Sequence, residues 1–193
     1  QDELAHALTE NILQINIESE PELNCLNKIA GLLNKKAPVA LRINPNIDAK
    51  SHDKISTGRL EDKFGIEWEG IRDVAKRARN LPNIEIIGLA MHIGSQLTDL
   101  EPFRDAFLRM KEILIALRAE GFSIRRLDLG GGLGIPYDGT VTPSPSEYGE
   151  VVKDIFENVD CDLIFEPGRL IVGNAGILVT RVNYVKEGTT RRF

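Results

Sequence analysis

The chain has 193 residues, of which 42% are apolar, and a formal net charge of −5. That apolar content supports one sizeable core, and the negative charge argues against nucleic acid or an acidic membrane as the partner. No apolar run approaches the roughly 20 residues that span a bilayer. The two cysteines, Cys25 and Cys161, are too few for a disulfide framework, so we expect a reducing, cytoplasmic environment.

Strand-like and helix-like segments alternate along the chain. Short apolar runs predict strands at 13–17, 38–43, 84–93, 127–129, 162–165 and 176–186. Helical spacing and helix-start signals predict helices over 1–10, from Ser19, over 69–80, from Thr98 and from Ser144. A long polar segment, 44–65, follows the second strand, and its length suggests a functional loop.

Three capping boxes mark helix starts. In each, Ser or Thr is followed three residues later by Glu, at Ser19–Glu22, Thr98–Glu101 and Ser144–Glu147. The helix from Thr98 is predicted to end just before Gly121, which suits the C′ position. Its apolar stripe, which we assign to the core rather than to a cofactor-binding surface, is Leu100, Phe103, Phe107, Met110, Leu114 and Leu117.

The alternation predicts an α/β fold with a parallel sheet under helical cover. Repeating βα units with short strands suit a (β/α) barrel. A doubly wound open sheet is the structural alternative. No internal sequence repeat is visible.

Chemically able residues fall at the carboxyl ends of the predicted strands, where α/β proteins place their sites. These residues are Arg42, His92, the triple glycine 130–132, and Glu166 with Arg169. Consecutive glycine amides form a concave anion site, and phosphate is a common occupant. A histidine, a phosphate turn, a carboxylate and arginines are therefore expected to converge on one rim.

Each of these residues also has a structural interpretation. The triple glycine is also typical of a plain flexible turn, and His92 of a buried core histidine. Glu166 can cap the next turn and pair with Arg169, and Arg42 can form a structural ion pair. The sequence has no spacing of Cys and His typical of zinc, no nucleotide-binding P-loop and no Gly-x-Ser-x-Gly, so we expect no metal.

A ligand with a phosphate and a polarisable ring matches this set, and pyridoxal phosphate fits. Its chemistry needs a phosphate anchor, a flat group against the ring face and a partner for the ring nitrogen. A carboxylate near that nitrogen keeps it protonated, so that the ring can accept electrons. Glu166 is the candidate for this role.

Six motifs resemble the diaminopimelate decarboxylases, which belong to the alanine-racemase-like, fold-type III class of pyridoxal-phosphate enzymes. The resemblance covers essentially the whole chain, in the family's order and spacing. The motifs are Arg42-Ile-Asn-Pro45, Ile55-Ser-Thr-Gly58, Lys63-Phe-Gly-Ile66, His92-Ile-Gly-Ser-Gln-Leu97, Leu129-Gly-Gly-Gly-Leu-Gly134 and Glu166-Pro-Gly-Arg169. The second and fourth favour the diaminopimelate branch over ornithine or arginine decarboxylases.

The resemblance implies a (β/α)8 TIM-type barrel that carries pyridoxal phosphate, a separate β-domain, and a homodimer whose active sites lie at the interface. Residues 1–193 are then one pyridoxal-phosphate-binding barrel domain, incomplete at both ends. We expect a partial barrel with about six of the eight strands, without the first strands and without the C-terminal β-domain.

The resemblance also implies residue roles around the cofactor. His92 would stack on the ring face, and Glu166 would pair with the ring nitrogen. Arg42 would support His92 from behind. The phosphate would be held by Ser95 and by the amides of Gly130, Gly131 and Gly132.

The turn Pro167–Gly168–Arg169 would lie by the phosphate, and Arg169 would also reach a substrate carboxylate. The family's Schiff-base lysine lies upstream of this chain, and its β-domain cysteine and tyrosine lie downstream. No lysine here matches that position, so no catalytic residue is expected in this chain. We therefore expect the polypeptide alone to convert little or no meso-diaminopimelate to lysine when pyridoxal phosphate is added.

The expected activity of the parent enzyme is decarboxylation of meso-2,6-diaminopimelate to L-lysine and CO2, the last step of lysine biosynthesis. One alternative is another fold-type III decarboxylase that acts on a basic amino acid or on carboxynorspermidine. A second is a non-catalytic homologue that binds the cofactor or a partner barrel. A third is an isolated folding fragment that binds nothing and associates through its unpaired strand edges.

Overall fold

The computed structural model describes residues 1–47, 64–137, 139 and 141–193. The motif at 55–58, Lys63 and most of the polar loop 44–65 therefore lie outside the described residues. The strands are β1 (Ile15–Ile17), β2 (Ala37–Asn44), β3 (Ile66–Glu67), β4 (Ile84–Ala90), β5 (Arg126–Asp128) and β6 (Asp162–Ile164). The helices are α1 (Asp2–Thr9), α2 (Glu20–Leu32), the 3-10 turn η1 (Trp68–Gly70), α3 (Ile71–Arg79), α4 (Glu101–Ala119), α5 (Pro145–Phe156) and α6 (Arg169–Val172).

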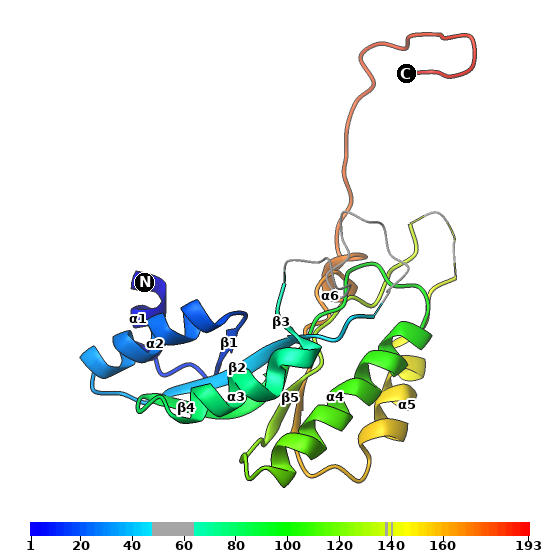
Figure 1. Ribbon diagram of the computed structural model, residues 1–193. Coiled ribbons are helices and arrows are strands. Elements are labelled where there is room, and N and C mark those ends of the chain that lie inside the picture. The colour runs from blue at the N-terminus through cyan, green and yellow to red at the C-terminus, as the bar shows by residue number, and fades with distance from the viewer. Residues whose placement is uncertain (48–63, 138, 140) are drawn as a thin grey trace.

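The strands form one parallel sheet in the order β1-β2-β4-β5-β6, and β3 pairs with the end of β2. Apart from the short β3, each new strand joins the edge left by the strand before it, so the sheet grows in one direction. A doubly wound sheet would reverse this order. Helices α3, α4 and α5 lie against the same face of the sheet (Figure 1). The predicted α/β fold is confirmed, and the arrangement is that of part of a (β/α)8 barrel wall.

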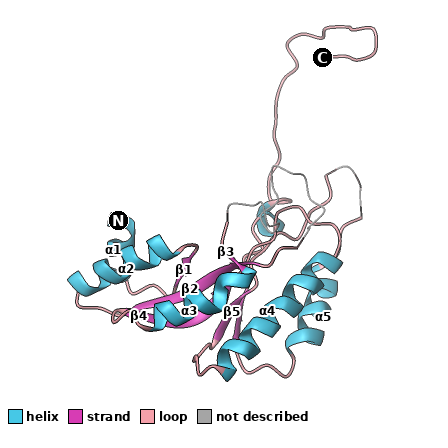
Figure 2. Ribbon diagram, in the orientation of Figure 1, coloured by secondary structure: helices cyan, strands magenta, loops and turns pink. Residues whose placement is uncertain are grey.

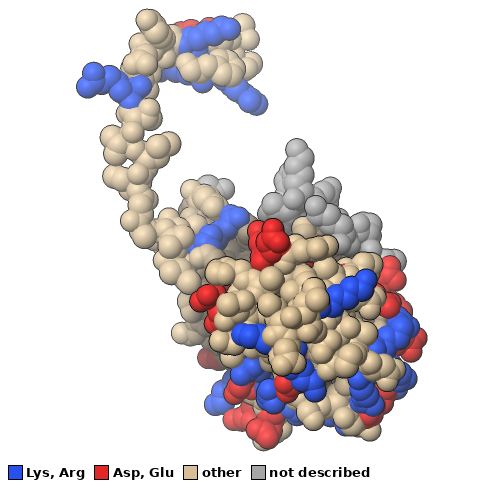
Figure 3. All heavy atoms as spheres, turned by 90° about the vertical axis from the view of Figure 1, so that its left-hand side faces the viewer, with Lys and Arg blue, Asp and Glu red and all other residues tan. Residues whose placement is uncertain are grey.

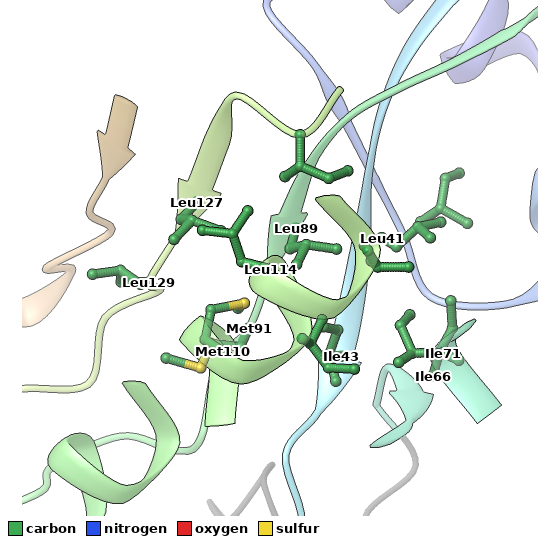
Figure 4. Close-up of a cluster of buried hydrophobic side chains, with 14 of the residues drawn as sticks. Leu41, Ile43, Ile66, Ile71, Leu89, Met91, Met110, Leu114, Leu127 and Leu129 are labelled. Carbon is green, nitrogen blue, oxygen red and sulfur yellow. The ribbon is translucent and has the colours of Figure 1, made fainter. Parts of the chain in front are cut away.

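The core lies between the sheet and these helices. Side chains alternate along a strand, and one set, which includes Leu41 of β2, Leu89 of β4 and Leu127 of β5, points toward α4 (Figure 4). There it meets Met110 and Leu114, two members of the predicted stripe, and all five are almost fully buried. Burial of each such side chain contributes roughly 1.5–3 kcal/mol. The alternate side chains of the same strands face the other side of the sheet.

Two of the predicted helix-end signals are confirmed. At the start of α5, Ser144 Oγ accepts from the Glu147 amide at 3.2 Å, and the Glu147 carboxylate accepts from the Ser144 amide at 2.8 Å. After α4, Gly121 has φ +80°, a conformation that a side chain would strain. The amide of Gly121 donates to Arg118 and that of Phe122 donates to Leu117, which is the Schellman pattern.

The other two capping boxes differ from the prediction. Thr98–Glu101 is wrong, because α4 begins at Glu101 and the Glu101 amide donates to Asp99 Oδ1 at 3.0 Å. A short aspartate side chain bonds readily to the amide two residues on and so displaces the threonine. At α2, Ser19 caps the Glu22 amide at 3.4 Å, but the Glu22 carboxylate accepts from the Glu18 amide instead of that of Ser19.

The strand predicted at 176–186 is also wrong. This segment is extended and exposed, and it belongs to an arm that leaves the body of the molecule (Figures 1 and 2). Figure 3 shows the same arm standing apart from the charged surface of the body. Ile177 and Leu178 are about nine-tenths exposed, at 90% and 92%. A strand needs a neighbour for its backbone hydrogen bonds, and among the described residues only Phe193 pairs with this segment, at its last residue, Lys186.

Among the helices that the structure describes, none combines the length and the apolar character needed to cross a bilayer.

Candidate cofactor site

A polar cavity lies on the side of the sheet opposite α3, α4 and α5. Its position follows from strand alternation, because Arg42 stands between the core residues Leu41 and Ile43, and Asp128 stands between Leu127 and Leu129. The cavity has a volume of about 250 Å³. It is lined by Asn16, Arg42, Ala90, Met91, His92, Asp128 and Glu166. Five strands therefore contribute to one site, as the predicted convergence requires.

His92, two residues after β4, presents its imidazole to the cavity. Its Nδ1 accepts a hydrogen bond from the Gly131 amide at 3.3 Å, which assigns the ring proton of the neutral form to Nε2. Burial lowers the pKa of His92, and so does the charge of Arg42, while Asp128 acts in the opposite direction. The imidazole is therefore held neutral at neutral pH, and a neutral ring is suited to lie against another aromatic ring.

Asp128, the last residue of β5, is only 3% exposed. Its Oδ2 accepts from Asn16 Nδ2 at 3.0 Å, and its Oδ1 accepts from the Gly130 amide at 3.0 Å. Asn16 Oδ1 in turn accepts from Gln14 Nε2 at 2.9 Å. Neither Asp128 nor Asn16 was among the predicted site residues. Asp128 could have been recognised from the sequence, because it lies between two leucines in an apolar strand, and a carboxylate buried there must have hydrogen-bond partners.

Glu166 lies two residues after β6, and its backbone amide donates to Gly130 O at 2.8 Å. Its side chain is partly exposed and shares the cavity with Asp128. Partial burial raises the pKa of Glu166, and the charge of Asp128 and a hydrogen bond between the two carboxyl groups raise it further; Arg42 acts against them. The site therefore contains two carboxyl groups in one cavity instead of one isolated carboxylate.

Arg42 forms the structural ion pair that was its alternative interpretation, and it also lines the cavity. Its Nη1 donates to Glu18 Oε1 at 2.5 Å, and the second oxygen of Glu18 accepts from the Gly65 amide at 3.3 Å. Glu18 was not among the predicted site residues. Because Glu18 fixes the guanidinium, Arg42 lies within electrostatic range of both His92 and Glu166.

The three glycines let the ends of three strands approach one another. A Cβ at Gly130 would lie 2.3 Å from Met91 O, one at Gly131 would lie 1.8 Å from Glu166 O, and one at Gly132 would lie 2.2 Å from Gly94 O. None of these separations is possible for real atoms, so the turn requires glycine at all three positions. The interpretation as a plain flexible turn is therefore wrong.

Two of the three glycine amides have partners within the chain. The Gly130 amide donates to Asp128 and the Gly131 amide donates to His92 Nδ1. Gly132 has φ +103°, a conformation that favours glycine, and the role of the turn as a phosphate cradle stays a prediction. The first two glycines instead orient the aspartate and the histidine of the cavity.

The remaining predicted residues adjoin the cavity without lining it. Ser95 is half-buried in the loop after β4. Pro167 and Gly168 continue from Glu166 beside Gly131. Arg169 does not pair with Glu166, because its Nη1 bonds to Gln96 Oε1 at 3.3 Å and to Tyr137 Oη at 3.0 Å.

Gln96 holds two loops together at this end of the sheet. Its side-chain amide donates to Ile135 O at 2.6 Å, and its side-chain oxygen accepts from the Ile135 amide at 3.2 Å. Gln96 adopts φ +61°, an uncommon conformation for a residue with a side chain. It therefore links Arg169 to the loop that carries His92 and Ser95.

These residues fit pyridoxal phosphate. A neutral imidazole and an acid of raised pKa line one cavity, where a pyridine ring would need a stacking group and a partner for its nitrogen. The tightly packed glycine turn lies beside the turn 166–168, where an anion would need backbone donors. No lysine is among the described residues that line the cavity.

Comparison with known proteins agrees with this chemistry. The family model described as "Pyridoxal-dependent decarboxylase, pyridoxal binding domain" matches residues 1–173. A diaminopimelate decarboxylase of Vibrio cholerae is 50% identical over 192 residues, which are 99% of this chain and 46% of that protein.

Two solved structures extend the comparison. The diaminopimelate decarboxylase of Helicobacter pylori complexed with L-lysine has a TM-score of 0.94 at 39% identity, over 99% of this chain and 48% of that one. The enzyme of M. jannaschii, in co-complex with L-lysine, has a TM-score of 0.88 at 35% identity, over 99% of this chain and 46% of that one.

The chain spans about half the length of the curated relatives it matches. The family model covers nearly all of it, and the polar cavity lies within the matched residues. The chain therefore belongs to the pyridoxal-dependent decarboxylases and forms part of their pyridoxal binding domain.

Proposed function

We propose that the parent enzyme removes CO2 from the D-centre of meso-2,6-diaminopimelate and so produces L-lysine. The observation that carries this proposal is the shared cavity of His92 and Glu166, in which the pKa of the imidazole is lowered and the pKa of the carboxyl group is raised. Similarity to relatives named diaminopimelate decarboxylase supports the substrate. So does L-lysine, the expected product, with which two similar solved structures are complexed.

Pyridoxal phosphate, when bound, supplies a conjugated ring that accepts the electron pair left by the departing carboxyl group. In this proposal the His92 imidazole lies flat against one face of that ring. The Gly131 amide fixes the plane of the imidazole through Nδ1. Arg42 discourages protonation of His92, because two neighbouring cations would repel.

Glu166 holds a proton at the ring nitrogen. A protonated nitrogen makes the ring a stronger electron acceptor than a neutral one, so the electron pair released with CO2 is better stabilised. The raised pKa of Glu166 suits this role, because the acid can give its proton to a basic nitrogen and remain beside it as the counter-charge.

The phosphate is assigned to the rim next to the cavity. Ser95, the Gly132 amide and the turn Pro167–Gly168 would hold it, while the amides of Gly130 and Gly131 keep their internal partners. Arg169 would contribute positive charge at this end and bind a substrate carboxylate. Its bonds to Gln96 and Tyr137 hold the guanidinium in position for that contact.

A homodimer with shared active sites, in the cytoplasm, belongs to the same proposal. The resemblance supports it. Light scattering of the full-length protein tests the assembly, and a monomeric mass at assay concentrations would contradict it.

The activity is tested on the full-length protein that carries this chain, supplied with pyridoxal phosphate. We expect lysine and CO2 from meso-diaminopimelate, with kcat/KM at least about 10²-fold higher than for ornithine, arginine or carboxynorspermidine, because a buried polar site rejects substrates that leave its groups unpaired. A preference for one of the other three would assign the protein to another branch of the same class. Cofactor binding without CO2 release from any of the four would identify a non-catalytic homologue.

A further inference from the structure

The cavity contains a second carboxyl group for which the proposed reaction has no role. Asp128 is buried, with only 3% of its surface exposed to solvent. Both of its oxygens are fixed, one by Asn16 and the other by the Gly130 amide. Burying a carboxylate is costly unless donors compensate for the lost water, and these two donors supply that compensation. Asp128 is thereby held in a fixed place.

Glu166 differs from Asp128 in all these respects. Its side chain is exposed and lines the same cavity as Asp128, and a hydrogen bond with Asp128 is one cause of its raised pKa. When two carboxyl groups stand this close, the first proton binds tightly and settles on the group with fewer competing donors. That group is Glu166.

The other charged groups around Glu166 do not reverse this order. Arg42 of β2 favours the ionised form of Glu166, but its guanidinium is already paired with Glu18. His92, after β4, is held neutral. Glu3 of α1 lines the open side of the cavity and carries negative charge. Tyr148 of α5 is near enough to Asp128 for burial and that carboxylate to raise its pKa, so it stays neutral as well.

We propose that Asp128 is a positioning residue, which keeps a proton on Glu166 and holds that acid toward the cavity, with Asn16 and the Gly130 amide fixing Asp128 itself. The site then presents a carboxylic acid to an incoming ring nitrogen. Glu166 would give its proton to that nitrogen, its O–H bond breaking as the N–H bond forms, and would remain beside it as the counter-charge, while Asp128 would stay unchanged. This inference rests on the proposed function only for the identity of that ring.

The experiment is a pH titration of the full-length protein without cofactor. Glutamate is labelled with 13C at the side-chain carboxyl carbon, and the Glu166 signal is identified by its loss in Glu166→Gln. We expect its midpoint to lie above the ordinary value of 4.5 and to fall toward that value in Asp128→Asn. Asp162→Asn is the matched control, because Asp162 is an exposed acid of β6, the strand next to β5, and pairs with Arg126. Its removal is expected to leave the midpoint unchanged.

Two results would overturn the proposal: a Glu166 midpoint at or below 4.5 in the wild-type protein, or a raised midpoint that Asp128→Asn leaves in place. If Asp128→Asn does not fold, the same titration of wild-type protein labelled with 13C at the aspartate side-chain carboxyl tests the proposal. The coupling requires one buried aspartate signal to move at the Glu166 midpoint, and its absence would contradict the pair. Because no substrate is present, a failed decarboxylase assay leaves this outcome untouched.

Discussion

Gly131→Ala is expected to destabilise the protein by about 3 kcal/mol and to abolish tight cofactor binding. The added Cβ would lie 1.8 Å from Glu166 O and 2.7 Å from the Glu166 carbonyl carbon, both backbone atoms that no rotamer change can move. The two turns must therefore separate. Separation pulls the Gly131 amide away from His92 Nδ1 and turns Glu166 away from Asp128. One methyl group thus disturbs the stacking group and the acid together.

Denaturant unfolding and a fluorescence titration with pyridoxal phosphate measure the two effects. Gly149→Ala is the matched control, because Gly149 lies inside α5 and a Cβ there would have nothing within 4 Å. That substitution should stabilise the protein by about 0.5–1 kcal/mol, since alanine loses less backbone entropy in a helix than glycine. Equal and small changes for both variants would show that the two turns are not in close contact.

Part of the site was predictable because α/β proteins place their functional residues at the carboxyl ends of parallel strands. His92 and Glu166 each follow an apolar run that becomes a strand, and parallel strands bring their carboxyl ends to one edge. Their place in a common cavity therefore followed from local patterns alone. The same reasoning reached Arg42, although it could not show that Glu18 fixes the guanidinium.

Asp128 and Asn16 could not be found in this way, because what matters about them is a contact between distant strands. They are 112 residues apart in sequence, and only the order β1-β2-β4-β5-β6 and the curvature of the sheet place them within hydrogen-bonding distance. The Gly130 amide bonds to Asp128 and the Gly131 amide bonds to His92. The second of these bonds likewise depends on β4 and β5 being neighbours. Sequence patterns identify which residues are capable of chemistry, and pairings across the sheet decide how they are used.

Competition between weak local signals explains the errors in secondary structure. Thr98 matched the capping pattern, but Asp99 lies nearer to the Glu101 amide and takes the bond. The run 176–186 has strand composition, but strand composition only describes what suits a half-buried pleated surface. Without a neighbouring strand among the described residues, its apolar side chains remain exposed.

Glu166→Gln is expected to lower kcat by about 10²-fold or more, because a positioned proton-transfer group contributes on that scale. Glutamine has nearly the same shape but carries no charge to balance a protonated ring nitrogen, so the electron-accepting form of the ring is lost. KM for meso-diaminopimelate should change little, since in the proposed site Glu166 would face the ring nitrogen and not the substrate. Steady-state kinetics of the full-length protein measure both. Glu157→Gln, on the exposed end of α5, is the matched control and should keep wild-type kinetics.

The same substitution should stabilise the folded protein as the pH rises. The folded-state pKa of Glu166 lies above its ordinary value of 4.5, so between these two values the folded protein holds a proton that the unfolded chain has released. Stability falls with pH wherever the folded state binds more protons, and glutamine removes this decline. Unfolding free energies of the two proteins should therefore diverge above about pH 5 in favour of Glu166→Gln. A catalytic acid held against its solution preference costs stability, so loss of both activity and stability at neutral pH would instead identify Glu166 as a structural residue.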